Sequence, residues 1–179
     1  MGVDIFSELL ETLKDLISSQ HFDKKLQIIV EKSAKLSGCS RVCFIILNKR
    51  KELIIRAGYP EGSHGIGKKI IPEHGEDFLM KVIKDAIPVI ITDPKTDPRT
   101  SYMKDLANTY DISAIMFYPI SYKGESFGIL IFDAIADQKF TKEGMKIIDI
   151  IADIMTRVLV SEYERKKNEE KKLNIYKLY

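Results

Sequence analysis

The stretch SAIMFYPISYKGESFGILIFDA, residues 113–134, consists of two apolar segments on either side of the turn Lys123-Gly124-Glu125. Both segments are rich in β-branched and aromatic residues. Two such runs joined by a short turn that contains glycine are typical of a β-hairpin. We therefore expect strands at 113–122 and 126–135, and we place them in the centre of an antiparallel sheet.

Further elements are predicted outward from this hairpin. Val42–Leu47 and residues 52–57 read as a second hairpin, and residues 89–92 as a short strand. Apolar residues three and four positions apart indicate amphipathic helices, which we place at 3–18, 23–37, 75–86, 101–110 and 142–163. Asp23 is the expected N-cap of the second of these helices, Gly38 its C-terminal stop, and Thr141 the cap of the last helix.

This order of elements predicts an α+β fold with a central antiparallel sheet. The N- and C-terminal helices should cover one face, and the middle helices and loops the other. A space between a sheet and such a cover is a natural site for a small molecule. We divide the chain into an amphipathic helix at 1–20, a domain at 21–162, and a charged helix or linker at 163–179.

Composition excludes several classes of function. The 179 residues carry a net charge of +2, and the tail from 162 to 179 holds six basic and four acidic residues, so the rest of the chain is neutral. A neutral body argues against a nucleic-acid surface, which needs clustered positive charge. No apolar run approaches the ~20 residues that cross a bilayer. The two cysteines, Cys39 and Cys43, suggest neither a disulfide framework nor a zinc site, which favours a reducing cytoplasm.

Several stretches resemble the GAF domain, the small-molecule sensing module of cyclic-nucleotide phosphodiesterases, phytochromes, histidine kinases and bacterial enhancer-binding activators. The resemblance spans residues 22–160. It rests on the central hairpin with Tyr118-Pro119-Ile120 and Gly128-Ile129-Leu130, and on GCSRVCFIIL at 38–47, AIPVIITDPKTDPRT at 86–100 and FTKEGMKIIDIIADIMTRVL at 140–159.

The resemblance implies a PAS-related sheet, a small ligand between the sheet and the pocket helices, and a homodimer formed through the terminal helices. It also implies an output domain or a partner signalling protein. The ligand itself is not identified. Gly144-Met145 stand where cyclic-nucleotide-binding members have an acidic pair, and the motifs support neither haem nor bilin.

The segment IITDPKTDPRT, residues 90–100, gathers Asp93, Asp97 and Arg99, which are separated from one another by Pro94 and Pro98. Three interpretations remain open. The carboxylates could ligate a metal, although a metal site needs further convergent ligands. They could shape turns, with Arg99 pairing to one of them. Alternatively the loop borders the pocket, and Arg99 binds a carboxylate or phosphate of the ligand.

Other candidates follow from their places in the predicted fold. His74, at the start of the pocket helix, could be a haem ligand, an anion donor or an exposed loop residue, whereas His64 is expected on the surface. Asp133 is an acid in an apolar strand, so it needs a buried partner or an exposed strand end. With no catalytic or metal-binding residue predicted, the expected ligand-binding set is Phe44, Ile46, His74, Phe78, Asp93, Asp97, Arg99, Tyr102, Met116, Tyr118 and Asp133.

Three functions remain possible at this point. The first is a non-catalytic sensory domain that binds a small molecule and signals through its terminal helices. The second is a dimerisation scaffold whose cavity is filled by its own side chains, namely Phe78, Met80, Tyr102 and Tyr118. The third is a redox enzyme of the free methionine sulfoxide reductase type that uses Cys39 or Cys43, although the positions of these cysteines do not match that enzyme.

Overall fold

The computed structural model describes residues 5–176. The helices are α1 (Ile5–Ser18), α2 (Phe22–Ser37), α3 (Glu76–Asp85), α4 (Lys104–Thr109) and α5 (Lys142–Tyr176). The strands are β1 (Arg41–Leu47), β2 (Leu53–Tyr59), β3 (Val89–Ile91), β4 (Ile112–Tyr122) and β5 (Glu125–Ile135). Two short 3₁₀ helices, η1 (Pro72–His74) and η2 (Pro98–Met103), lie in the connections.

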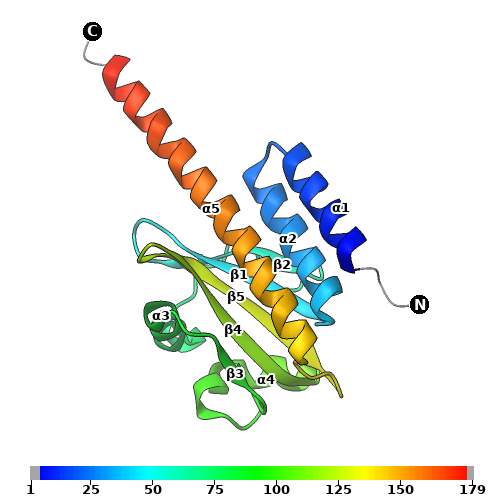
Figure 1. Ribbon diagram of the computed structural model, residues 1–179. Coiled ribbons are helices and arrows are strands. Elements are labelled where there is room, and N and C mark those ends of the chain that lie inside the picture. The colour runs from blue at the N-terminus through cyan, green and yellow to red at the C-terminus, as the bar shows by residue number, and fades with distance from the viewer. Residues whose placement is uncertain (1–4, 177–179) are drawn as a thin grey trace.

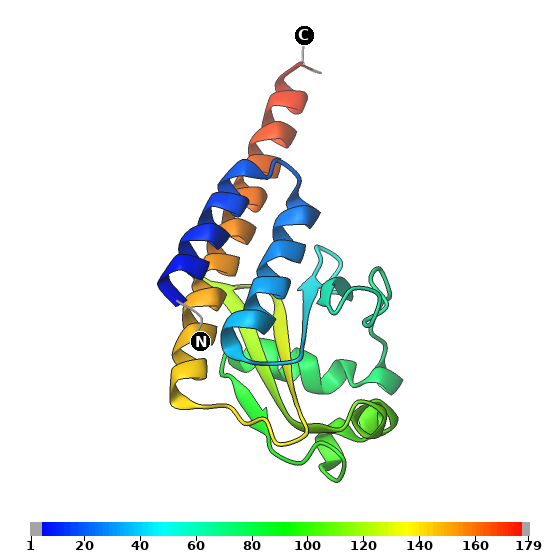
Figure 2. The same ribbon diagram turned by 90° about the vertical axis from the view of Figure 1, so that its right-hand side faces the viewer.

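The five strands form one antiparallel sheet in the order β2-β1-β5-β4-β3. The hairpin of β4 and β5 lies inside this sheet, as predicted. Helices α1, α2 and α5 cover one face, whereas α3, α4 and their loops lie on the opposite side (Figures 1 and 2). The predicted α+β fold is therefore confirmed.

Each face of the sheet has its own hydrophobic core. On the face covered by α2 and α5, Phe44, Leu130 and Phe132 pack with helix residues such as Val30 and Ile148. On the opposite face the core includes Cys43, Ile45, Ile115, Phe117 and Ile129 from the strands, Leu79, Val82 and Ile83 from α3, and Ala107 from α4. Successive residues of a strand point to opposite faces, which explains this division.

The predicted facing of four strand residues is wrong. Phe44, Ile46, Met116 and Tyr118 were assigned to the pocket face, but all four belong to the core beneath α2 and α5. The side-chain period of a strand is two, so an error of one residue exchanges the two faces completely. These residues therefore pack beneath α2 and α5 and do not line the space beneath α3 and α4.

The helix ends agree with the sequence in part. Gly38, at φ 74°, adopts the left-handed conformation that ends α2, and the backbone N–H of Gly144 donates to Thr141 Oγ1 at 3.0 Å at the start of α5. The N-cap of α2 is His21, not Asp23, which lies in the first turn. Helix α5 continues unbroken from the domain through Tyr176, and within residues 5–176 no helix has the length and apolarity to cross a membrane.

Candidate ligand site

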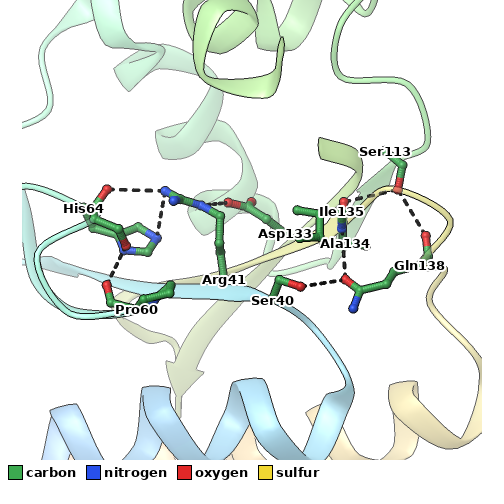
Figure 3. Close-up of polar contacts among 10 residues, drawn as sticks. Ser40, Arg41, Pro60, His64, Ser113, Asp133, Ala134, Ile135 and Gln138 are labelled. Atoms are coloured by element: carbon green, nitrogen blue, oxygen red, sulfur yellow. Dashed lines mark hydrogen bonds and ion pairs between the residues drawn. The ribbon is translucent and has the colours of Figure 1, made fainter. Parts of the chain in front are cut away.

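A buried ion pair joins β1 and β5 on the face covered by α3 and α4. Arg41 and Asp133 lie directly opposite each other in the antiparallel register. Each is only 4% exposed, and Arg41 Nε donates to Asp133 Oδ2 at 3.2 Å (Figure 3). The expectation that a buried Asp133 needs a partner is thus met by Arg41, and its alternative, an exposed carboxylate, is wrong.

The second oxygen of this carboxylate has no hydrogen-bond partner among the described residues. Asp133 Oδ1 is buried and accepts no hydrogen bond from any described residue. Burial raises the pKa of Asp133 to about 6, although Arg41 partly opposes this shift. An unsatisfied buried acceptor costs free energy and is rare in native proteins, so this oxygen is poised to accept a hydrogen bond from a donor that enters the site.

The other side of the Arg41 guanidinium contacts the loop after β2. Its Nη2 lies 3.4 Å from both the carbonyl oxygen of Ser63 and Nε2 of His64 (Figure 3). A guanidinium can only donate, so Nε2 must accept, and the proton of His64 resides on Nδ1. Nδ1 then donates to Ser63 Oγ at 2.6 Å, and Ser63 Oγ donates to the carbonyl oxygen of Pro60 at 2.5 Å.

This network keeps His64 neutral. Burial, together with the charge of Arg41, lowers the pKa of His64 to about 4. The ring is half-buried, so the prediction that His64 is a surface residue is met only in part. The site near neutral pH therefore contains one guanidinium, one carboxylate and an uncharged imidazole.

Two glycines leave room for aromatic rings around this pair. A Cβ on Gly58 would lie 2.7 Å from Nδ1 of His64, and a Cβ on Gly75 would lie 2.2 Å from Cε1 of Tyr102. The guanidinium of Arg41 also stacks on the ring of Tyr110, 3.9 Å from its centroid. The rings of His64 and Tyr110 therefore contact Arg41 directly, and Tyr102 of η2 lies close enough to Asp133 to be affected by its charge.

The buried hydroxyl and thiol groups near Asp133 resist ionisation. Burial raises the pKa of Tyr102, and the charges of Cys43 and Asp133 add to this effect. Burial likewise raises the pKa of both free cysteines, that of Cys39 to about 11, with Asp133 contributing at each. A thiol with a raised pKa is a poor nucleophile at neutral pH, which disfavours cysteine redox chemistry.

The segment from Asp93 to Arg99 forms a turn. Asp97 Oδ1 accepts from the backbone N–H and Nε of Arg99 at 2.8 and 2.9 Å, and its Oδ2 accepts from Nη2 at 2.6 Å. Asp93 Oδ2 accepts from Thr96 Oγ1 at 2.6 Å. The side-chain hydrogen bond from Arg99 lowers the pKa of Asp97. The carboxylates therefore cap η2 and close the turn, as one of the three interpretations held.

The remaining candidates are scattered. His74 is exposed at the end of η1, whereas Phe78 packs edge to face on Phe117 with ring centroids 5.0 Å apart. Tyr118 lies on the opposite face, where its hydroxyl donates to Asp149 Oδ1 of α5 at 2.9 Å. Within residues 5–176, no group of three or more His, Cys, Asp or Glu side chains is placed to hold a metal ion.

Arg41, His64 and Asp133 form a polar cluster. The ligand-binding set predicted from the sequence included only Asp133 of these three residues. Arg41 and His64 are separated by 92 and 69 residues from Asp133, so no motif joins them. One signal was present: Arg41 borders the apolar run 42–47, just as Asp133 ends the run 127–132. A charged residue in each of two neighbouring antiparallel strands suggests a cross-strand pair.

Comparisons with known proteins identify solved structures that have a similar fold. Three solved GAF domains cover between 92 and 93% of this chain, and between 97 and 99% of each of those chains is covered in return. Two are from phosphoenolpyruvate-protein phosphotransferases: that of Coxiella burnetii has 16% identity and a TM-score of 0.77, and that of Acinetobacter 14% and 0.73. The third, from a two-component sensor histidine kinase of Bacillus halodurans, has 17% identity and a TM-score of 0.61.

At these identities the likeness concerns the fold alone, and no curated protein sequence matches the chain. The sequence model of the GAF domain, however, matches residues 19–160, which is most of the chain. GAF domains are sensory and regulatory domains of signalling proteins and are generally non-catalytic. The chain belongs to the GAF domain family.

Proposed function

We propose that this GAF domain is a sensor for a small molecule that donates a hydrogen bond to Asp133 Oδ1. The ligand binds on the face of the sheet covered by α3, α4 and the loop that carries His64. The observation behind this proposal is the buried carboxylate oxygen that no described residue satisfies. A hydrogen bond to a charged group contributes about 1.5–3 kcal/mol, which corresponds to roughly 10- to 150-fold in affinity.

The charges of the site narrow the ligand class. Arg41 and Asp133 compensate each other and His64 is neutral, so an anion entering beside the free oxygen would be repelled by the carboxylate. A ligand with N–H or O–H donors and little negative charge fits better. Tyr102, which rests on the backbone of Gly75, is the part of the cover that such a ligand displaces.

A thermal-shift screen followed by calorimetry tests this proposal. Nucleobases, amino-acid amides and polyamines serve as donor-rich probes, and dicarboxylates as anionic ones. In Asp133→Asn the amide nitrogen stands where the acceptor was, so we expect the affinity for a donor-rich hit to fall at least tenfold. Asp93→Asn is the control, because Asp93 is an exposed turn residue. Unchanged affinity in Asp133→Asn, or no hit at all, contradicts the proposal.

The dimerisation scaffold is the second candidate. Phe78 packs on Phe117, and Tyr102 occupies the space above Gly75, so side chains of the domain fill part of the expected cavity. This candidate predicts that no probe binds the wild-type protein while dimers persist. If the Tyr102→Ala variant then binds a probe, the ring of Tyr102 closes the site at Asp133 in the wild-type protein.

We propose that two copies associate through α1 and α5. Leu10, Leu13 and Ile17 of α1 are 42, 42 and 83% exposed, and Ile150 of α5 is 44% exposed. Apolar side chains at this spacing form a stripe that a second copy can cover. The ligand then signals by changing how α5 rests on the sheet, where Tyr118 bonds to Asp149, and α5 carries the change to an output domain or partner protein.

Sedimentation equilibrium tests the dimer. Ile17→Lys should weaken self-association by at least tenfold, because it places a charge on the contact. Ile87→Lys is the matched control: Ile87 is 64% exposed but lies in the loop between α3 and β3. A wild-type protein that stays monomeric at all concentrations contradicts the proposal, as does equal weakening by both substitutions.

A further inference from the structure

An open groove lies at the end of the sheet formed by the β1–β2 and β4–β5 turns. These two turns lie side by side near α3 in Figure 1. The groove has a volume of about 900 Å³ and extends from α3 to α5. A Cβ on Gly124, in the β4–β5 turn, would meet no atom within 4 Å, so this rim is open.

The floor of the groove is apolar and partly aromatic. Met80 and Ile83 of α3 line it, together with Phe127 of β5 and Tyr163 of α5. The rings of Phe127 and Tyr163 meet edge to face with centroids 6.3 Å apart, which fixes the end of the floor nearest α5. Such a floor binds apolar side chains of an occupant by removing them from water.

The rim of the groove is positively charged. Lys49, Lys51, Lys81 and Lys84 line it, against only Asp85 and Glu125. Lys51, Lys81 and Lys84 are exposed and form no ion pair with any residue in the described range 5–176. Because the chain without its tail is neutral, the groove gathers positive charge that the rest of the domain lacks.

We propose that this groove docks an acidic segment of a partner protein. Apolar side chains of the segment pack on Met80, Phe127 and Tyr163, while its carboxylates lie against the lysines of the rim. Charge complementarity of this kind selects the partner and accelerates encounter more than it adds affinity. The proposal does not depend on the ligand site at Asp133, because none of the residues lining the groove belongs to that cluster.

The position of the groove gives this partner a regulatory role. The segment would contact α3, which covers the proposed ligand site, and α5, which leaves the domain. If the ligand shifts α3, it changes the affinity for the partner, and the partner must change the affinity for the ligand by the same factor. A partner bound in the groove would thus respond directly to whether the ligand site is occupied.

Fluorescence anisotropy with a labelled heptapeptide tests the proposal. The probe has the sequence Glu-Glu-Leu-Phe-Glu-Glu-Leu, and a second peptide carries Lys in place of each Glu. We expect the acidic peptide to bind at least tenfold more tightly than the basic one, and added salt should reduce this difference. Equal binding of the two peptides, or binding of neither, would overturn the proposal.

Charge-reversal variants locate the binding. Lys51→Glu, Lys81→Glu and Lys84→Glu together should weaken the acidic peptide at least tenfold. The control combines Lys104→Glu, Lys139→Glu and Lys146→Glu, which are exposed lysines outside the groove and give the same change in net charge. Circular dichroism verifies that both variants are folded. Equal weakening in the two triple variants would show nonspecific attraction and would refute the site.

Three further measurements separate the alternatives. Tyr163→Ala removes part of the floor without changing any charge, and it should weaken the acidic peptide at least threefold; an unchanged affinity rejects the apolar contact. If decanoate displaces the peptide and binds more tightly than it, the occupant is a small amphipathic anion and the docking proposal fails. Asp133→Asn should leave peptide binding unchanged in the absence of ligand, so failure at one site is not mistaken for failure at the other.

Discussion

Arg41 and Asp133 are direct cross-strand neighbours, and their ion pair uses only one of the two carboxylate oxygens. One carboxylate oxygen is therefore paired with Arg41, and the other has no hydrogen-bond partner among the described residues. Breaking such a buried pair is costly, since it leaves one charge in the interior without compensation.

The first prediction concerns this pair. Arg41→Met should lower the free energy of unfolding by about 3–5 kcal/mol, because Asp133 then remains buried without its counter-charge. Arg99→Met is the control: it also breaks an Arg–Asp pair, but an exposed one, and should cost less than ~1 kcal/mol. Urea denaturation measures both. Equal losses would mean that burial of the pair has no energetic consequence.

The second prediction concerns pH. Native Asp133 retains its proton up to about pH 6, whereas the unfolded side chain releases it near 3.8, so its contribution to stability falls as the pH rises through this window. His64 acts in the opposite direction. Unfolded His64 gains a proton below 6.5 and native His64 only below about 4, so its contribution rises with pH between these values.

Two variants separate these opposing contributions. Relative to wild type, Asp133→Asn should make the free energy of unfolding rise more steeply between about pH 4 and 6, and His64→Gln should make it rise less steeply. Urea denaturation at several pH values gives both slopes. If both substitutions change the slope in the same direction, the assignment of the two titrations is wrong.

The third prediction compares two glycines with similar backbones. Gly38 and Gly75 have φ values of 74° and 78°, but only at Gly75 would a Cβ meet a neighbouring ring, that of Tyr102. Gly38→Ala should cost about 1 kcal/mol from backbone strain alone. Gly75→Ala should cost clearly more in urea denaturation, and adding Tyr102→Ala should recover part of the difference. Additive effects of the two changes would contradict the contact.

The fourth prediction concerns the bond between the sheet and α5. Tyr118→Phe removes the hydrogen bond to Asp149 and should cost about 1 kcal/mol. Amide hydrogen exchange should accelerate in α5 around Asp149. Tyr122→Phe, on the same strand at an exposed position, is the control. No change in exchange at α5 would show that this bond does not hold the helix to the sheet.

The sequence predicts the fold far better than it predicts the site, for physical reasons. Periodicity identifies helices and strands because each strand or helix encodes its own pattern, and Gly38 and Thr141 mark ends by local backbone chemistry. The facing of β1 and β4 depends on one residue of register, which no local pattern fixes, and the prediction for Phe44 and Met116 failed there. The polar cluster joins Arg41, His64 and Asp133 through sheet pairing and one loop, so it exists only in three dimensions.

Helix α5 has a mechanical consequence. Its 35 residues form a rod roughly 50 Å long, so a tilt of about 5° at its base displaces the far end by roughly 4–5 Å. Beyond the sheet, Arg165 pairs with Glu162 and Glu169 at spacings of one helical turn, which stiffens the rod where apolar packing ends. Helix α5 therefore amplifies motion at its base: a tilt too small to disturb the sheet displaces the helix near Tyr176 by the length of a side chain.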